Sequence, residues 1–296
     1  MRICVIFNPA ARGEKAAKLQ HILHAFARDC TCKPTSFAGE AQLLAAQAVR
    51  DGFDTIIAAG GDGTLNEVLN GFGDVPDGFG QARLGILPLG TINVFARELK
   101  IPLKLEKAWE LISQNRETLI DLPQAEFISG GKTVTRYFAQ LAGAGLDAKA
   151  VALVDWNWKT KVGPLAYVTA GFRALQSKQS EISVVTPTGS AQGELVLIGN
   201  GKLYGGNFTI FPHADLQDGE FDICVVPKVN LRVLLQVGAG YLTGNFHRFS
   251  GAKLLRASSA TLSSDEKTFF QLDGEDAGEL PARLSLHPKK IRVLTP

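Results

Sequence analysis

The chain has 296 residues, of which 45% are hydrophobic and 20% are charged, and its formal net charge is +2. This is the composition of an ordinary globular protein, at a length that suits two domains. No basic arm or aromatic-basic module is present, so nucleic acid is not expected as a partner. No apolar run reaches about 18 residues, so no transmembrane helix is expected. Four cysteines without zinc-ligand spacing predict reduced thiols and a cytoplasmic location.

Strand-like and helix-like segments alternate over residues 1–123. Apolar strand patterns occupy 3–7, 30–37, 53–59, 83–87 and 119–122, and helical patterns occupy 17–26, 41–49 and 105–112. This alternation predicts an α/β domain with a parallel sheet and right-handed crossovers. Ligands bind outside the carboxyl ends of the strands in such sheets, so the turns that follow the strands are the first candidates for a site.

The most informative of these turns is Gly60-Gly61-Asp62-Gly63-Thr64, between the third strand and a helical segment. Glycines allow positive φ and a close approach of the backbone to a ligand, and amides at a helix N-terminus bind phosphate. The turn is neither a Walker loop, which carries a lysine, nor a G-x-G-x-x-G motif. A carboxylate beside phosphates requires a cation or a proton between them, which gives Asp62 a candidate role.

A second turn of the same kind, Gly90-Thr91-Ile92-Asn93, follows the next strand and opens another helix. Two such turns from one sheet could hold a polyphosphate from two sides. The alternative is that Thr64 and Thr91 only cap their helices.

Residues 124–296 have a different pattern, with many short strands separated by Gly and Pro turns. This pattern predicts a β-rich, sandwich-like second domain, and the active site is expected in the cleft between the two domains. Two acidic turns lie in this domain, at 215–222 and 272–276. The first has the carboxylate density of a calcium loop without the EF-hand pattern, and a solvated turn is the alternative.

Five motifs of the chain, in this order, resemble those of the diacylglycerol kinase catalytic-domain family, which is related to sphingosine kinases and more distantly to NAD kinases. They are Asn8-Pro9, the Gly60–Thr64 turn with Asn66-Glu67, residues 88–97, residues 215–222, and Asp273-Gly274-Glu275. The resemblance implies an α/β nucleotide domain followed by a β-rich lipid-substrate domain. It also implies an ATP-dependent lipid kinase that transfers the γ-phosphoryl group to a hydroxyl of a membrane lipid such as diacylglycerol.

The same resemblance implies roles for individual residues. Glu275 would be the general base, and Asp62 would hold the magnesium ion of the nucleotide, directly or through water. A structural magnesium ion would bind the carboxylate of Asp218 and the main-chain carbonyls of Asp215 and Glu220. The implied ATP-binding residues are Asn8, Thr35, Gly60, Gly61, Asp62, Gly63, Thr64, Leu65, Asn66, Glu67, Gly90, Thr91 and Asn93.

Two other functions fit parts of the sequence, namely an NAD kinase, which shares the GGDGT turn, and a non-catalytic lipid- or nucleotide-binding protein. A peripheral membrane contact is expected for a lipid kinase, and Trp156 and Trp158 beside Lys159 and Lys161 are its candidate. The alternative is that both tryptophans pack between the domains. The acceptor lipid and the oligomeric state, including a homodimer, are left open by the sequence.

Overall fold

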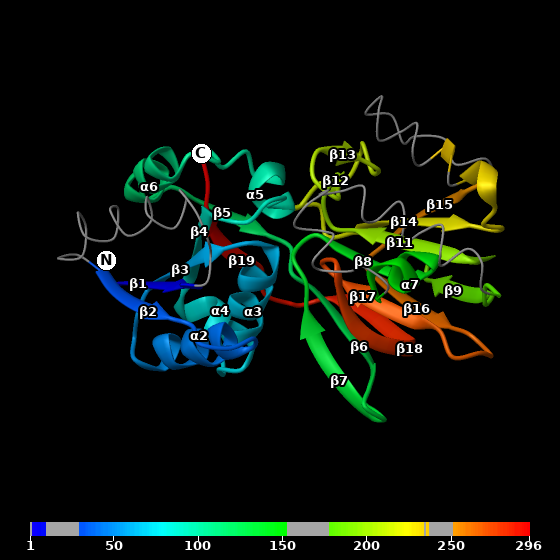
Figure 1. Cartoon of the computed structure of the whole chain (residues 1–296), viewed down its shortest axis with the longest axis horizontal. Helices are drawn as coiled ribbons and strands as arrows, with labels where there is room; N and C mark the ends of the chain where they lie inside the picture. The colour runs from blue at the N-terminus through cyan, green and yellow to red at the C-terminus, as the bar shows by residue number, and fades with distance from the viewer. Residues whose placement is uncertain (1, 10–29, 153–177, 234, 237–250) are drawn as a thin grey trace. The chain divides into compact units, whose positions relative to one another are not determined.

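The computed structural model describes residues 2–9, 30–152, 178–233, 235–236 and 251–296. These residues divide into two compact units (Figure 1). Unit 1 consists of residues 1–122 and 287–296, and unit 2 consists of residues 123–286.

Unit 1 is an α/β unit. Its elements are β1 (Ile3–Phe7), β2 (Cys30–Pro34), α2 (Glu40–Arg50), β3 (Thr55–Gly60), α3 (Asp62–Gly73), α4 (Gly78–Gln81), β4 (Arg83–Pro88), α5 (Val94–Glu98), α6 (Leu105–Ser113), β5 (Glu117–Ile120) and β19 (Ile291–Leu294). The strand order is β2-β1-β3-β4-β19-β5, and β2, β1, β3, β4 and β19 run parallel. The predicted parallel α/β domain is therefore confirmed.

The strand order of this sheet has a switch point, where successive connections leave β1 in opposite directions. The chain passes from β1 to β2 on one side and then crosses to β3 on the other side of β1. Ligands of doubly wound sheets bind at such a switch point, outside the carboxyl ends of the two strands. Here those ends carry Asn8, after β1, and Gly60, at the end of β3.

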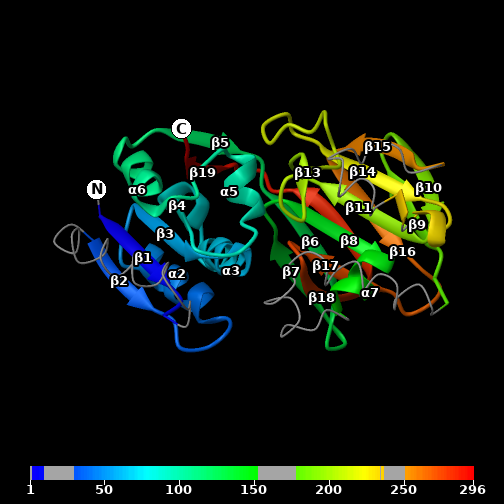
Figure 2. The same cartoon turned by 45° about the horizontal axis from the view of Figure 1, so that its top comes forward.

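Unit 2 is built mainly from β-strands (Figure 2). Its elements are β6 (Pro123–Ser129), β7 (Lys132–Tyr137), β8 (Leu141–Gly145), α7 (Leu146–Ala152), β9 (Ile182–Thr186), β10 (Gly189–Gly193), β11 (Leu195–Gly199), β12 (Leu203–Tyr204), β13 (Phe208–Thr209), β14 (Phe221–Val226), β15 (Lys253–Ala257), β16 (Ser259–Ser263), β17 (Phe269–Leu272) and β18 (Glu275–Leu286).

The larger sheet of unit 2 has 11 strands, and nine of them follow the order β10-β9-β16-β18-β17-β8-β11-β14-β15. Side chains from both ends of this path share one buried core, for example Ile182 of β9 and Phe221 of β14. A sheet whose two ends enclose the same core must fold over on itself. The predicted sandwich-like architecture is therefore confirmed.

The last ten residues differ from the prediction, which assigned all of 124–296 to the second domain. Residues 287–296 belong to unit 1, where β19 pairs in parallel with β4 and antiparallel with β5. The apolar pattern of 291–294 indicates a buried strand but does not identify its partners. Which sheet β19 joins depends on tertiary packing, and the sequence of 291–294 alone does not specify that packing.

Candidate active site

The Gly60–Thr64 turn connects β3 to α3 directly. Gly61 is the N-cap residue of the helix, has extended backbone angles (φ −90°, ψ −170°), and has no side chain with which to cap the first amides. A Cβ on Gly60 would lie 2.4 Å from Cβ of Thr64, so this position requires glycine. The turn therefore presents backbone amides and the positive end of a 12-residue helix at the switch point of the sheet.

The second glycine turn packs against the first. The amide of Leu89 donates to the carbonyl of Gly60 at 2.9 Å, and a Cβ on Gly90 would lie 2.6 Å from Cα of Gly61. Asn93 has φ +53° and donates from its side chain to the carbonyl of Gly90 at 2.7 Å, which closes the turn before α5. The two predicted turns are thus neighbours, and Asp62 Oδ1 lies 3.5 Å from the amide of Phe95 in α5.

Of the other residues predicted to bind ATP, some are exposed and some are buried. Asn8 and Thr91 are exposed beside these turns, whereas Thr35, after β2, is buried and donates its amide to the carbonyl of Phe7 at 2.8 Å. Leu65 and Asn66 are buried in α3, where Asn66 accepts hydrogen bonds from the side chain of Asn70.

Glu67 has a different environment from the one its place in the motif suggests. Its two carboxylate oxygens accept from the amides of Gly39 and Ala41 at 2.9 and 3.0 Å. Gly39 is the N-cap residue of α2 and has no side-chain cap of its own. Glu67 therefore caps α2 from the neighbouring helix, which fixes α3 beside α2.

In unit 2, Asp273 and Gly274 form the two-residue turn between β17 and β18, and both have positive φ, +49° and +83°. Two positive φ angles are those of a type I′ hairpin turn, for which Asp-Gly is a favoured dipeptide. Leu272 and Glu275 are paired across this turn. Glu275, the predicted base, is therefore the first residue of β18.

Asp273 anchors this turn. Its carboxylate accepts from the amides of Ala139, Gln140 and Leu141 at 2.8, 2.9 and 3.0 Å. Its own amide donates to the carbonyl of Leu141 at 2.7 Å. Hydrogen bonds to an ionised acceptor are stronger than neutral ones, so three of them hold the turn firmly. Sequence reasoning did not identify this function, because the partners lie more than 130 residues away.

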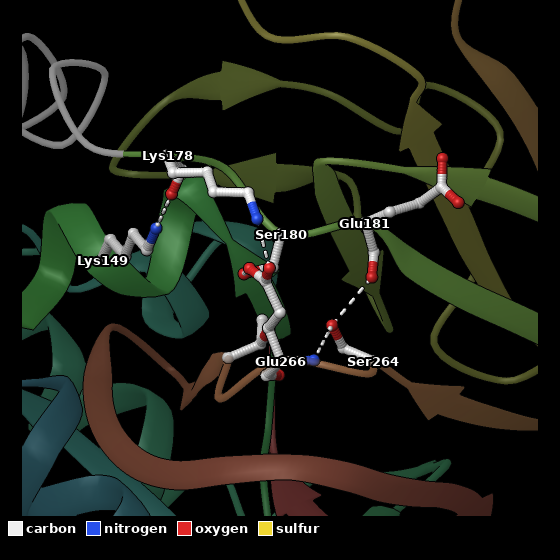
Figure 3. Close-up of polar contacts among 7 residues, drawn as sticks. Lys149, Lys178, Ser180, Glu181, Ser264 and Glu266 are labelled. Carbon is white, nitrogen blue, oxygen red and sulfur yellow. Dashed lines mark hydrogen bonds and ion pairs between the residues drawn. The ribbon is translucent and has the colours of Figure 1, made fainter.

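Helix α7 is held by a separate group of polar contacts (Figure 3). Lys149 of α7 donates to the carbonyl of Lys178 at 2.7 Å. The side chains of Lys178 and Ser180 both point to the carboxylate of Glu266, as Figure 3 shows. The hydrogen bond from Lys178 is the main reason why the pKa of Glu266 lies below its ordinary value. These contacts connect α7 to the segment before β9 and to the loop between β16 and β17.

The acidic loop at 215–222 has a cation of its own. Arg256 forms ion pairs with Asp218 and Glu220, and its Nε lies 3.7 Å from the carboxylate of Asp222. The other oxygen of Asp218 accepts from the amide of Glu220 at 3.0 Å, and Asp215 accepts from the amide of Gln217 at 3.0 Å. The described residues contain no group of three or more His, Cys, Asp or Glu side chains arranged to hold a metal ion.

This arrangement does not fit the predicted structural magnesium ion on Asp215, Asp218 and Glu220. Both oxygens of Asp218 already have partners, and a guanidinium beside them repels a divalent cation. The family pattern in the sequence predicted a metal site here, and Arg256, more than 30 residues later, was not part of that pattern.

Two further observations limit what the described residues can do. Burial raises the pKa of Cys4 to about 11 and that of Cys224 to about 12, so neither thiol is an effective nucleophile at neutral pH. None of the described helices combines the length and the hydropathy needed to cross a bilayer. The predicted membrane contact lies outside the described residues, since it consists of Trp156, Trp158, Lys159 and Lys161.

Comparison with known proteins covers both units. Residues 2–125 match the diacylglycerol kinase catalytic domain family, and residues 140–295 match the YegS C-terminal NAD kinase beta sandwich-like domain. A diacylglycerol kinase of Staphylococcus haemolyticus is 33% identical over 305 residues, which cover 100% of this chain and 89% of that protein. A diacylglycerol kinase of Staphylococcus saprophyticus is 32% identical, with 100% and 95% covered.

A solved structure supports the same fold. The crystal structure of a diacylglycerol kinase from Bacillus anthracis str. Sterne superposes with a TM-score of 0.78 at 23% identity, covering 100% of this chain and 97% of that one. With both domain matches and full-length relatives above 30% identity, the chain belongs to the diacylglycerol kinase catalytic-domain family of lipid kinases.

Proposed function

We propose that the protein transfers the γ-phosphoryl group of ATP to a hydroxyl of a membrane lipid, with diacylglycerol as the first candidate acceptor. The observation that carries this proposal is the pair of packed glycine turns that follow β3 and β4 in the unit 1 sheet. Phosphates are bound by backbone amides and helix N-termini of this kind. The acceptor is suggested by the names of the relatives, which are diacylglycerol kinases.

On the nucleotide side, the amides of the Gly60–Thr64 turn are the proposed phosphate ligands. The magnesium ion that accompanies ATP supplies charge neutralisation during phosphoryl transfer. Asp62 is the carboxylate of this turn, at the first position of α3, and is the residue we propose to interact with that ion. The proposal for unit 1 thus involves Asp62 and the backbone rather than a lysine, in contrast to a Walker loop.

On the acceptor side, Glu275 is the proposed general base. A lipid hydroxyl is a weak nucleophile, and a carboxylate within hydrogen-bond reach makes it reactive by accepting its proton. The hydroxyl oxygen forms a bond to the γ-phosphorus, the bond from that phosphorus to the bridging oxygen of ADP breaks, and the proton passes to Glu275. The products are a phosphorylated lipid and ADP.

The test is an activity measurement with labelled ATP on a panel of acceptors. The panel contains vesicles with diacylglycerol, monoacylglycerol, phosphatidylglycerol or a sphingoid base, and NAD in solution, and products are identified by mass spectrometry. Phosphorylation of a lipid is the expected result. Phosphorylation of NAD alone would establish the NAD kinase alternative, and nucleotide binding without any product would establish a non-catalytic binding protein.

Two variants test the phosphate turn in the same assay. Gly61→Ala places a Cβ 3.3 Å from Cα of Gly90, and Asp62→Asn removes the carboxylate. Both should raise the KM for ATP and leave the order of preference among lipids unchanged. Gly73→Ala, at the other end of α3, is the control. An unchanged KM for ATP in both variants would refute the phosphate-binding assignment.

A further inference from the structure

Asp147, the second residue of α7, is a buried carboxylate in unit 2 without a role in the proposed chemistry. Its Oδ1 accepts from the hydroxyl of Tyr204, and its Oδ2 accepts from Nε2 of Gln271 at 2.7 Å. Burial raises the pKa of Asp147, although both hydrogen bonds oppose this effect. Burial of a carboxylate costs folding free energy unless the carboxylate is hydrogen-bonded. The two hydrogen-bond partners of Asp147 therefore indicate what it does.

Gln271 connects Asp147 to the turn that precedes Glu275. The side-chain oxygen of Gln271 accepts from the amide of Gly274 at 2.8 Å. A backbone amide can only donate, so the oxygen of Gln271 must face the turn and its NH₂ group must face Asp147. The acceptor at Asp147 therefore determines the orientation of Gln271, and Gln271 in turn holds Gly274.

Gly143 provides the space for this connection. It lies directly opposite Gln271 in the pairing of β8 with β17. A Cβ at this position would lie 2.1 Å from Oδ2 of Asp147 and 2.7 Å from Nε2 of Gln271. Only glycine leaves room for the hydrogen bond between the two side chains. Gly143 and Asp147 both belong to the glycine-rich segment 143–148, which the proposed function does not otherwise use.

We propose that Gln271, oriented by Asp147, is a positioning residue for Glu275. This inference rests on the proposed role of Glu275 as the base. Asp273 ties the first residue of the turn to residues 139–141, and Gln271 ties the second residue, Gly274. Hydrogen bonds thus hold both residues that precede Glu275, and they fix the position of the backbone at Glu275. A displacement of about 1 Å at a reacting group can cost about 10²-fold in rate.

The experiment measures kcat and KM for ATP with diacylglycerol in mixed detergent micelles. Gln271→Met keeps the size of the side chain and removes both hydrogen bonds, and Gly143→Ala disrupts them from the opposite strand. We expect kcat to fall about 10- to 100-fold with KM for ATP within about twofold of the parent value. Gln124→Met is the matched control, because it removes a glutamine hydrogen bond to Ser285 of the same strand β18, far along it from the turn.

Asp147 supplies a graded test. In Asp147→Asn the side-chain oxygen can still accept from Gln271, and the new NH₂ group can donate to the hydroxyl of Tyr204. In Asp147→Leu no acceptor remains for Gln271. The asparagine variant should therefore retain a much larger fraction of kcat than the leucine variant.

Hydrogen exchange at the amide of Gly274, measured by NMR, provides a readout that is independent of activity. Exchange should accelerate in Gln271→Met and in Asp147→Leu and stay at the parent rate in Gln124→Met. A parental kcat in Gln271→Met, with exchange at Gly274 accelerated, would overturn the inference. Equal losses of kcat in Gln271→Met and Gln124→Met would overturn it as well, because the effect would then be general destabilisation.

The proposed function can fail separately from this inference. If Glu275→Gln turns over at a rate near that of the parent, Glu275 is not the base. The proposed role of Glu275 and the positioning role of Gln271 are then both overturned. If Glu275→Gln is inactive while Gln271→Met and Asp147→Leu are fully active, only the positioning role is overturned.

Discussion

Asp273 and Glu275 are two carboxylates in one turn region with different surroundings. Asp273 accepts hydrogen bonds from three consecutive backbone amides, an arrangement that holds two parts of unit 2 together. Glu275 begins the strand after the turn and is partly exposed. Asp273 thus has a structural role, whereas Glu275 is the carboxylate that we propose as the general base.

This difference in roles leads to opposite expectations for two variants. Glu275→Gln should lower kcat by about 10²–10⁴-fold and leave the melting temperature near that of the parent. Asp273→Ala should lower the melting temperature, because each charge-assisted hydrogen bond contributes about 1.5–3 kcal/mol. Activity assays and thermal unfolding of both variants check this. A Glu275→Gln variant within a few-fold of parental activity would contradict the assignment of the base.

Asp147 should make stability depend on pH. Its folded-state pKa is raised by burial above the ordinary value of 3.8, so the stability that it contributes is complete below that value and is lost as pH rises through the folded-state pKa. Asp147→Asn cannot ionise and lacks this loss. The melting temperature of the parent relative to the variant should therefore decline as pH rises above about 4. A difference that does not change as pH rises would contradict the prediction.

At the residue scale, the sequence reveals local chemistry and not distant partners. The glycine turns at 60–63 and 273–274 are recognisable because their backbone angles and spacing depend on adjacent residues. The contact between Asp147 and Gln271 joins residues 124 positions apart, and it exists only because β8 pairs with β17. No local pattern in the sequence contains that pairing.

At the scale of elements, the pairing of β14 with β15 places Arg256 among the carboxylates of the acidic loop. Asp222 and Arg256 are directly opposite in this pairing, and Asp218 and Glu220 lie in the segment that enters β14. Burial raises the pKa of Asp222, and Arg256 is the main influence that lowers it. The register of two strands thus supplies the positive charge that the motif was expected to take from a metal ion.

Arg256→Met should remove the ion-pair partner of Asp218, Glu220 and Asp222. We expect a lower melting temperature, by the equivalent of about 1 kcal/mol, since Arg256 is partly exposed and its ion pairs are screened by solvent. The parent, without nucleotide, should melt at the same temperature in magnesium and in a chelator, because Arg256 already pairs with these carboxylates. A parent melting temperature that rises with magnesium would restore the predicted metal site.

Strand predictions were most accurate where a strand is apolar on both faces. Residues 3–7 form a strand with the predicted bounds, and β3 and β4 lie within a residue or two of theirs. Such strands need only a continuous apolar run. The partners of a strand depend on the whole fold, which is why the last strand of the chain was assigned to the wrong domain.

At the scale of the whole molecule, the chain leaves unit 1 after Leu122, forms unit 2, and returns at His287. The returning strand β19 lies inside the unit 1 sheet, between β4 and β5, and Ile291 and Val293 are buried there. Lys290 and Asp121 form an ion pair at 2.8 Å beside the two crossings. Unit 2 is therefore an insertion within unit 1.

Deletion of 287–296 should consequently damage unit 1 and not unit 2. Without β19, β4 and β5 lose a shared neighbour, and the sheet has exposed apolar edges in its interior. We expect loss of ATP binding and rapid proteolysis within residues 1–122, while fragments of 123–286 resist digestion. Limited proteolysis with mass spectrometry checks this, and equal resistance of both units would contradict it.

The place of β19 also has a consequence for biosynthesis. Domains of a nascent chain usually fold in the order in which they leave the ribosome. Here unit 1, whose synthesis begins first, requires residues 287–296, so it cannot be completed until unit 2 has been translated. The described strands of unit 2 all lie within 123–286, so this unit can fold earlier. A ribosome that stops before residue 287 would therefore release a chain in which unit 2 is complete and unit 1 is not.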